Sequence, residues 1–318
     1  MLYIKLSYVL LLTIMLIYLN KASEGWIVDR LRNEWYENCV DVSGRFLFSS
    51  DIVWIISPWT FNELFFKFIG NKKIVYSIYH FEENDLNKIK SKIEKIDDYI
   101  SCYHTISKKT KSILEKLTSK EVYYIPFWID SKIWFEIKNK EDLFQKFNLN
   151  FKNYYVGSFQ RDSLRSNPAK PKLIKGPDIF VENMIELREK KQNLEILLAG
   201  KKRDYIINRL EKEKIPYRYF EMVNQKELNE LYNCLNLYVI SSRVEGGPQA
   251  IAECGMTMTP LVSTDVGMAS DFLNKKSIYK KGEFLKAVPD PKYLNKKITN
   301  LVIPDGLELF KNMFKNLK

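Results

Sequence analysis

The stretch Ser241-Ser-Arg-Val-Glu-Gly-Gly-Pro-Gln-Ala-Ile-Ala-Glu253 follows a short apolar run and contains two glycines, a proline and two glutamates. The preceding run, residues 235–240, predicts a buried strand, and Pro248 suits the first helical position because a proline lacks the N–H that would be unpaired there. We therefore expect a strand, a glycine turn at Gly246 and Gly247, and a helix. Backbone N–H groups at such a helix start attract phosphate, and glycines let a ligand approach the backbone closely.

Two carboxylates flank this turn. Glu245 lies in the turn itself, and Glu253 lies about a turn and a half into the predicted helix. A carboxylate accepts hydrogen bonds from pairs of hydroxyls, which both sugars and ribose offer. A glutamate beside a loop is also often only solvated. Taken alone, the two residues leave both interpretations open.

The stretch resembles the glutamate-x7-glutamate signature of family 4 retaining glycosyltransferases, which have the two-domain GT-B fold. Further matches to that family occur over about residues 120–275 in the right order and spacing. They are Pro126-Phe-Trp-Ile-Asp130, Val156-Gly-Ser-Phe-Gln-Arg161, Lys175-Gly-Pro-Asp178, the strand-like residues 194–200, and Thr259-Pro-Leu-Val-Ser-Thr-Asp-Val-Gly267. The order of several matches makes the resemblance more specific than one motif.

The resemblance implies an α/β protein of the GT-B type, with two Rossmann-like domains whose parallel sheets face a cleft. It implies a metal-independent, hexosyltransferase-like enzyme that moves a sugar from a nucleotide-diphosphate donor to a glycan or lipid-linked acceptor. The implied donor-binding residues are Arg161, Lys175, Gly246, Gly247, Pro248, Gln249 and Glu253. Among them Arg161 and Lys175 would hold the diphosphate and Glu253 the ribose, while Glu245 would face the transferred sugar.

The chemistry of these residue types agrees with those roles. The fork of an arginine and the point charge of a lysine suit two phosphates, and both can neutralise the charge that grows on a leaving diphosphate. In a Lys-rich chain each could equally be an ordinary surface cation. No residue stands out as a covalent nucleophile with a matched base. The resemblance implies retention of configuration, and we therefore expect a front-face displacement in which the departing phosphate oxygen helps to deprotonate the acceptor hydroxyl.

The chain has two histidines, His80 and His104. His80 ends an apolar run, residues 73–80, that predicts a strand, and ligands of open α/β sheets bind at the carboxyl ends of strands. Related glycosyltransferases often carry a histidine there, facing the donor sugar, so we predict that His80 acts at the reaction centre with Glu245. His104 follows a second strand-like run and is the weaker candidate, with a structural role as its alternative.

Length and composition are compatible with two domains. A chain of 318 residues that is 46% hydrophobic can bury two cores of ordinary size. Strands and helices alternate from about residue 150 onward, which predicts parallel sheets. We expect an acceptor-side domain over residues 1–145, a nucleotide-sugar domain over 146–290, and a terminal segment over 291–318. The resemblance implies that this segment returns to pack on the first domain.

The N-terminus departs from the family pattern. Its members open with a strand and a glycine-rich loop, whereas Leu6 to Leu19 is almost continuously apolar and contains no glycine, and Gly25 is the nearest one. Three interpretations stay open for this run: a buried first strand, a membrane-seeking segment, or a signal peptide. The missing loop also motivates an alternative function, a catalytically weakened member that acts as a binding or scaffold protein.

The net charge of +11 raises the question of an anionic partner. Nucleic acid is not expected, because no recognition module or interleaving of basic with exposed aromatic residues is evident. Residues 108–120 instead predict a basic amphipathic helix that either rests on anionic lipid or is simply solvated. We predict a cytoplasmic protein, with peripheral contact at the inner face of the membrane as a further expectation.

Neither a metal nor a cofactor is predicted. Four cysteines are scattered without the paired spacing of a zinc site or a disulfide framework. The adjacent acid pairs, Glu82-Glu83 and Asp97-Asp98, lie in charged stretches and do not resemble the spaced aspartates of metal-dependent transferases. The nucleotide sugar would therefore be a substrate, and the protein itself would need no bound ion.

Overall fold

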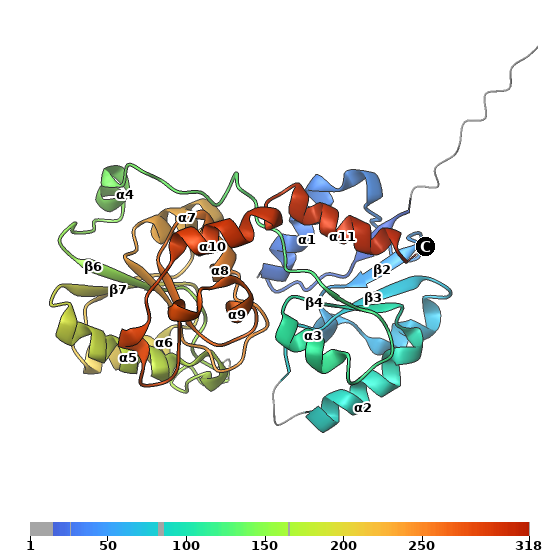
Figure 1. Ribbon diagram of the computed structural model, residues 1–318, viewed down its shortest axis with the longest axis horizontal. Helices are drawn as coiled ribbons and strands as arrows, with labels where there is room; N and C mark the ends of the chain where they lie inside the picture. Colours follow the sequence, from blue (N-terminus) through green and yellow to red (C-terminus); the bar gives the residue numbers. More distant parts are fainter. Residues whose placement is uncertain (1–14, 26, 82–85, 165, 318) are drawn as a thin grey trace, which may run out of the picture.

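The structure is a computed structural model that describes residues 15–25, 27–81, 86–164 and 166–317. The chain forms two lobes, each built around one sheet (Figure 1). The sheet of the first lobe has the strand order β1-β2-β3-β4-β5, and that of the second has the order β11-β10-β9-β6-β7-β8. All pairings between these named strands are parallel. The predicted α/β class with two parallel sheets is confirmed.

The strands of the first lobe are β1 Ile17–Leu19, β2 Ile52–Ile55, β3 Lys73–Ser77, β4 Cys102–Thr105 and β5 Val122–Tyr124, and its helices are α1 Ile27–Asn38, α2 Leu86–Ile96 and α3 Lys108–Leu114. The strands of the second lobe are β6 Tyr154–Ser158, β7 Leu194–Ala199, β8 Tyr217–Phe220, β9 Leu237–Ile240, β10 Leu261–Thr264 and β11 Ile278–Tyr279. The remaining helices are α4 Glu141–Lys146, α5 Pro177–Lys190, α6 Asp204–Lys212, α7 Gln225–Asn233, α8 Ala250–Met256, α9 Ala269–Phe272, α10 Pro291–Ile298 and α11 Asp305–Lys315.

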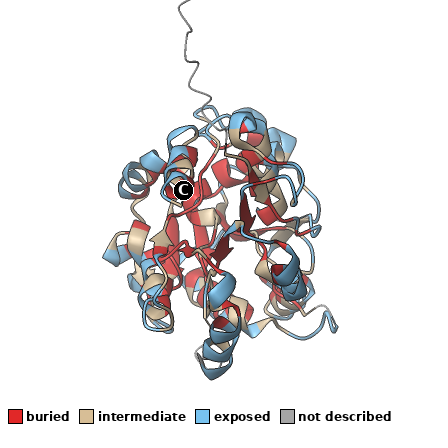
Figure 2. Cartoon of the chain, turned by 90° about the vertical axis from the view of Figure 1, so that its right-hand side faces the viewer, coloured by how far each residue is buried: buried red, intermediate tan, exposed pale blue. Residues whose placement is uncertain are grey.

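The inner strands of both sheets are largely buried and mostly apolar. All residues of β2, β7 and β9 are buried, as is typical of strands in parallel sheets. Figure 2 shows the buried residues gathered in the central layer, with exposed residues on the outer sides of the helices.

The last two helices pack on different lobes. Helix α10 contacts α8 in the second lobe, where Leu294 and Ile298 join the core. Helix α11 lies on the first lobe (Figure 1), and its Phe310 ring stacks on Trp54 with the ring centroids 4.9 Å apart. The chain therefore crosses between the lobes twice, once before α4 and once before α11.

The two crossings are hydrogen-bonded to each other. Ile129 N–H donates to Leu301 O at 2.9 Å, and Ile303 N–H donates to Ile129 O at 3.0 Å. Ile129 and Val302 thus form an isolated parallel bridge. The domain boundary expected near residue 145 stays a prediction, although Ile129 and Trp134 already pack in the core of the second lobe.

The described part of the apolar N-terminal run ends in a buried edge strand. Strand β1 pairs with β2, whereas most of the run, residues 6–14, lies outside the described residues. Gly25 lies in the turn between β1 and α1 with φ of +66°. The backbone N–H groups of Ser23, Glu24 and Gly25 donate to Asp29 at 3.0, 2.7 and 2.8 Å. One carboxylate thus supports a turn that has a single glycine.

The basic segment 108–120 is shorter as a helix than expected. Helix α3 ends at Leu114, which is buried in the core under the first sheet, and Leu117 packs against the same cluster. The apolar side of this segment therefore faces the protein, and contact of its basic side with lipid stays a prediction. Among the helices of the described ranges, none has the length and apolar character needed to cross a membrane.

His104 lies within β4 and has no exposed surface. Its Nε2 is 2.8 Å from Ile125 O, and its Nδ1 is 2.8 Å from Ser77 Oγ, which also accepts a hydrogen bond from Trp54 Nε1. Burial lowers the pKa of His104 to about 4. The ring is therefore a neutral, fully hydrogen-bonded part of the core, which supports the structural alternative for this histidine.

The contact between α11 and the first lobe predicts a large effect of Phe310→Ala. We expect the free energy of unfolding to fall by about 4 kcal/mol, because the change opens a cavity beside Trp54. Urea denaturation of both proteins would measure the difference. Phe46→Ala, at a side chain that is 74% exposed, is the control and should be close to neutral. An equally small effect of Phe310→Ala would contradict the packing described.

The neutral state of His104 predicts a loss of stability in acid. In the unfolded chain the histidine takes up a proton near pH 6.5, whereas the folded protein resists protonation down to about pH 4. The contribution of neutral His104 to the free energy of unfolding is thus fully present above pH 6.5. It falls by up to about 3 kcal/mol as the pH decreases from 6.5 to 4. Urea denaturation at pH 7 and pH 4.5 should show a smaller pH dependence for His104→Gln than for wild type. His80→Gln, at an exposed position, should retain the full dependence, and identical slopes for all three proteins would refute the assignment.

Candidate functional site

Lys175 and Glu245 meet at the carboxyl end of the second sheet. Gly176, which follows the lysine, has φ of +60°, and a Cβ built on it would lie 1.8 Å from Ser241 O. Only glycine therefore lets the turn before α5 pack against the end of β9. The packing puts the Lys175 ammonium in contact with Glu245 Oε1, and Ser242 Oγ donates to Glu245 Oε2 at 2.7 Å. Two residues that the sequence analysis assigned to one site are thus brought together.

The glycine turn touches the first lobe directly. A Cβ on Gly246 would lie 2.6 Å from Tyr79 Cβ, and one on Gly247 would lie 2.7 Å from Ile106 Cδ1. Gly246 thus lies against the main chain of the first lobe, whereas Gly247 lies against the end of the Ile106 side chain. His80 follows Tyr79, three residues beyond the end of β3, and is exposed. The loop that carries the predicted catalytic histidine therefore lies against the predicted donor turn.

Helix α8 begins later than the sequence analysis predicted. Ile251 N–H donates to Pro248 O at 2.9 Å, which closes a tight turn, and the first regular helical bond runs from Glu253 N–H to Gln249 O at 3.0 Å. The predicted start at Pro248 is therefore wrong by two residues, since the regular helix begins at Ala250. Gln249 Nε2 donates to Trp128 O in the first lobe at 3.2 Å, so this residue also contacts both lobes.

Glu253 is buried, with only 5% of its surface exposed. Its Oε1 accepts a hydrogen bond from Arg30 Nη1 at 2.9 Å, and its Oε2 accepts one from Tyr232 OH at 2.9 Å. Arg30 belongs to α1 of the first lobe, so the ion pair crosses between the lobes. The second glutamate of the motif is therefore separated from the Lys175 and Glu245 pair by its partners, and both of its oxygens are occupied.

Arg30 is shared with a second carboxylate, Glu34. Arg30 Nε lies 3.5 Å from Glu34 Oε1, and Trp128 Nε1 donates to Glu34 Oε2 at 2.8 Å. Burial raises the pKa of Glu34 to about 7, with the Arg30 charge acting in the opposite direction. The sequence analysis missed this network. The only local signal was the spacing of Arg30 and Glu34, which places them one helical turn apart.

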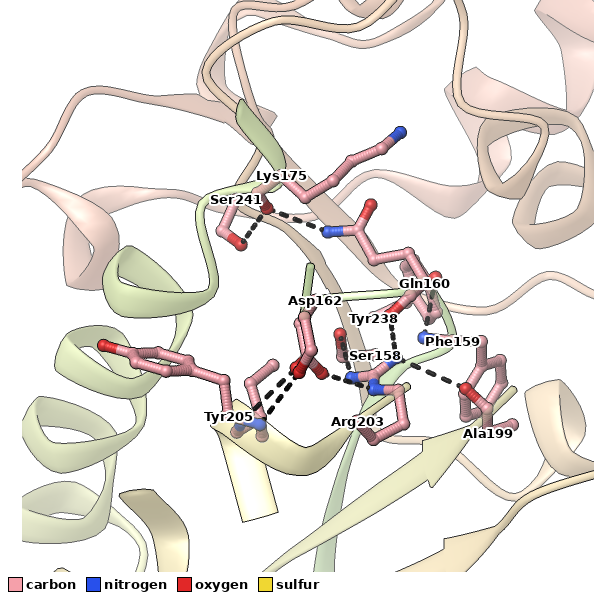
Figure 3. A network of polar contacts seen from close by, with 12 residues as sticks. Ser158, Phe159, Gln160, Asp162, Lys175, Ala199, Arg203, Tyr205, Tyr238 and Ser241 are labelled. Carbon is pink, nitrogen blue, oxygen red and sulfur yellow. Dashed lines mark hydrogen bonds and ion pairs between the residues drawn. The ribbon is translucent and has the colours of Figure 1, made fainter. Parts of the chain in front are cut away.

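Arg161 follows Gln160 in the loop after β6 and is half-buried. Gln160 Nε2 donates to Lys175 O at 3.1 Å, so this loop lies beside the turn that carries Lys175. In Figure 3 the Lys175 ammonium points away from Gln160 and from the buried arginine below it. No carboxylate within the described ranges pairs with Arg161. Its charge is therefore not neutralised by an ion pair there.

A buried arginine supports that loop (Figure 3). Arg203 Nε lies 2.7 Å from Asp162 Oδ2, an ion pair whose side chains are 0% and 1% exposed. Arg203 also donates to Gln160 O and, at 3.1 Å, to Ser158 Oγ. The guanidinium thus holds the loop from Ser158 to Asp162, which includes Arg161. Sequence reasoning did not identify this residue, since nothing in its local pattern distinguishes it from a surface cation.

The lobes meet again at the start of α3. Lys108 N–H donates to Asp271 Oδ2 at 3.0 Å, and Lys109 Nζ lies 3.3 Å from Asp265 Oδ2. Two of the lysines in the basic segment thus face carboxylates of the second lobe. Across the described part of the chain, no three His, Cys, Asp or Glu side chains gather in a way that could hold a metal ion.

Comparison with known proteins assigns a family to the second lobe. Residues 169–316 match the sequence model of the family described as Glycosyl transferases group 1. This segment contains the Lys175 and Glu245 pair, the glycine turn and Glu253. No curated protein sequence matches the chain.

The whole chain is similar in structure to solved glycosyltransferases of low sequence identity. Anabaena Alr3699/HepE, in complex with UDP and glucose, has a TM-score of 0.70 and 11% identity, with 96% of this chain and 99% of that chain covered. Sucrose-phosphate synthase from Thermosynechococcus elongatus has a TM-score of 0.65 and 13% identity, with 91% and 77% covered. The pneumococcal O-GlcNAc transferase GtfA, in complex with UDP and GlcNAc, has a TM-score of 0.62 and 14% identity, with 84% and 56% covered.

The family match includes Lys175, the glycine turn and Glu253 but begins after Arg161, and the similarity in fold extends over both lobes. Residues 169–316 therefore match glycosyl transferases group 1, and the chain as a whole has the GT-B fold of these solved glycosyltransferases.

Proposed function

We propose that this enzyme transfers a sugar, with retention of configuration, from a nucleotide-diphosphate donor to a glycan or lipid-linked acceptor. The observation that supports this proposal most is the contact of Lys175 with Glu245 beside the Gly246 turn, at the junction of the lobes. Their side chains are 23% and 15% exposed, so a ligand in the cleft could reach both groups. The proposal keeps their roles as the sequence resemblance implied them.

Lys175 and Arg161 would bind the diphosphate. Without donor, the Lys175 ammonium is neutralised by Glu245, and the diphosphate would compete for that charge when it binds. The glycine turn would let the phosphates approach backbone N–H groups. Once released from the lysine, Glu245 could accept hydrogen bonds from the sugar hydroxyls. UDP is the first nucleotide to test, because the Anabaena and pneumococcal structures each contain it.

Glu253 is proposed to bind the ribose. A carboxylate offers about four lone-pair positions, and Arg30 and Tyr232 use two of them. The remaining positions could accept ribose hydroxyls. Gln249 donates a hydrogen bond to Trp128 O in the first lobe, so binding of the same ligand would also affect this contact between the lobes.

The reaction we propose is a front-face displacement. The bond from the anomeric carbon to the diphosphate oxygen breaks, and the acceptor oxygen bonds to that carbon on the same face. The acceptor hydroxyl gives its proton to the departing phosphate oxygen. Lys175 and Arg161 would stabilise the charge on that diphosphate without a metal ion, while His80 and Glu245 orient the sugar. Contact between the lobes would exclude water that could hydrolyse the donor.

A second candidate function is donor binding without turnover. It is favoured by the engagement of both Glu253 oxygens and by the single glycine in the turn after β1. A protein of this kind would bind the nucleotide sugar but release no diphosphate. Measuring diphosphate release from a donor that binds would separate the two functions.

Lys175→Ala tests the proposed diphosphate site. We expect this change to weaken nucleoside diphosphate binding by about 2 kcal/mol, because it removes a charge-assisted contact to phosphate. Thermal-shift and calorimetric titrations with UDP, GDP, ADP and CMP, and with their sugar conjugates, would be run with EDTA present. Wild type should be stabilised by one nucleotide and the variant much less so.

Lys190→Ala, at an exposed position at the end of α5, is the matched control and should bind like wild type. Equal nucleotide affinity of Lys175→Ala and wild type would exclude the proposed diphosphate site. Stabilisation that disappears when EDTA is added would contradict metal independence.

Variants of Glu253 separate its structural role from its proposed ribose role. Glu253→Ala removes this partner from the largely buried Arg30 guanidinium, and we expect a loss of about 3 kcal/mol in unfolding free energy. Arg30 also pairs with Glu34, so the compensating variant is the triple variant Arg30→Met, Glu34→Gln, Glu253→Gln, in which none of the three charges remains and most of that stability should return. Donor affinity should nevertheless stay low, because a neutral amide is a poorer acceptor for ribose hydroxyls. Recovery of full donor affinity in the triple variant would show that Glu253 acts only in the contact between the lobes.

A further inference from the structure

Large apolar side chains are exposed together on the first lobe. The loop before β2 and the short helical turn before β3 carry Phe46, Phe48, Leu64, Phe65 and Phe68, which are 74%, 67%, 64%, 45% and 70% exposed. We refer to these five residues as the aromatic surface. Single exposed hydrophobic residues are common, whereas several on neighbouring segments indicate an interaction site.

The two segments of the aromatic surface lie side by side. Leu47 and Phe66, which alternate with its residues in sequence, pack into one core cluster under the first sheet. Lys72, just past the helical turn, donates from Nζ to Phe48 O at 2.8 Å. Buried residues therefore anchor both segments to the same part of the lobe, and their alternate side chains face outward.

The charge around the aromatic surface is basic. Arg45, Lys67 and Lys73 are exposed within or next to it. The one acid of the helical turn, Glu63, is neutralised by Lys92, whose Nζ lies 3.3 Å from Glu63 Oε1. Exposed aromatic rings surrounded by basic side chains are complementary to an interface of apolar chains and anionic headgroups.

The apolar N-terminal sequence reaches the protein at the same edge. Asp51 N–H donates to Leu16 O at 2.9 Å, and Gly44 N–H donates to Ile17 O at 2.8 Å. The described chain thus begins beside the loop that carries Phe46 and Phe48. The residues before it, 6–14, are almost entirely apolar in sequence and follow Lys5.

The aromatic surface is connected to the cleft through Trp59. This residue is 53% exposed and precedes the helical turn, and its ring centroid lies 6.2 Å from that of Tyr79. Tyr79 is the residue that touches Gly246 of the donor turn. Exposed aromatic groups thus extend along the first lobe as far as the site.

We infer that the aromatic surface seats the first lobe on a bilayer that contains anionic lipid. This binding does not depend on the proposed function. Aromatic side chains enter the headgroup region, and the flanking cations bind anionic headgroups. The surface differs from the basic segment 108–120, whose apolar side chains are packed in the core.

The test is vesicle co-sedimentation of the full chain. Vesicles of phosphatidylcholine with about one quarter phosphatidylglycerol should bind the protein, and vesicles of phosphatidylcholine alone should bind it less. The triple variant Phe48→Ser, Phe65→Ser, Phe68→Ser should lower the partition coefficient on the anionic vesicles by about tenfold or more. The variant should keep the wild-type thermal stabilisation by nucleotide, which shows that it is folded. If no nucleotide stabilises either protein, circular dichroism replaces this readout, and the proposed function fails independently of the bilayer result.

Met222→Ser is the matched control, because Met222 is 70% exposed but lies on the second lobe. It should leave vesicle binding unchanged. Equal binding of the triple variant and wild type would overturn the inference, since attachment would then come from the N-terminal sequence or another surface. Absence of wild-type binding to anionic vesicles would overturn it as well. So would a wild-type dimer in sedimentation that the triple variant abolishes, because the surface would then join two copies of the chain.

Discussion

The close approach of backbone to backbone at the end of the second sheet is the constraint on which the site depends. Gly176 lies against Ser241, and Gly246 lies against Tyr79, with no room for a Cβ at either contact. The first contact brings Lys175 to Glu245, and the second brings the lobes together. Because each contact involves main chain, a larger side chain at either glycine would displace a turn and not only a neighbouring side chain. The positions of Lys175 and Glu245 thus depend on two glycines, Gly176 and Gly246, whose lack of a Cβ allows the close contacts.

Charge at the junction of the lobes is balanced through shared partners. Arg30 lies between Glu253 and Glu34, while Lys175 contacts Glu245. In both cases a cation and a carboxylate neutralise each other when no ligand is present. Their burial differs, since Glu253 is enclosed whereas the Lys175 and Glu245 pair is partly open to solvent. The Lys175 and Glu245 pair can separate to bind a ligand at a lower free-energy cost than the Arg30 and Glu253 pair, because its charges are more exposed to water.

Much of this arrangement could be predicted from the sequence, because it depends on local patterns. Apolar runs, glycines and prolines indicate backbone geometry directly. They mark the strand before Ser241, the turn that precedes α5, and the turn at Gly246. The start of α8 was placed two residues early because a proline at the first helical position and a proline in a preceding turn have the same local pattern. For the segment 108–120 the sequence left two alternatives open for a similar reason, since periodicity does not say whether an apolar face meets lipid or core. Contacts between distant segments could not be predicted from local patterns, and only the family resemblance put Lys175 and Glu245 in one site. Arg30 and Glu253 are far apart in sequence and come from different lobes, so no local pattern connects them.

The bridge between Ile129 and Val302 has a mechanical consequence. Two chain crossings that ran separately would let the lobes twist, slide and swing independently. Because these two are bonded side by side, they form one joint at one edge of the molecule, and the motion left to the lobes is mainly rotation about it. Opening and closing then move every contact across the cleft in proportion to its distance from that joint. The second crossing leads into α11, which packs its aromatic rings into the core of the first lobe. This packing fixes the second crossing to the first lobe.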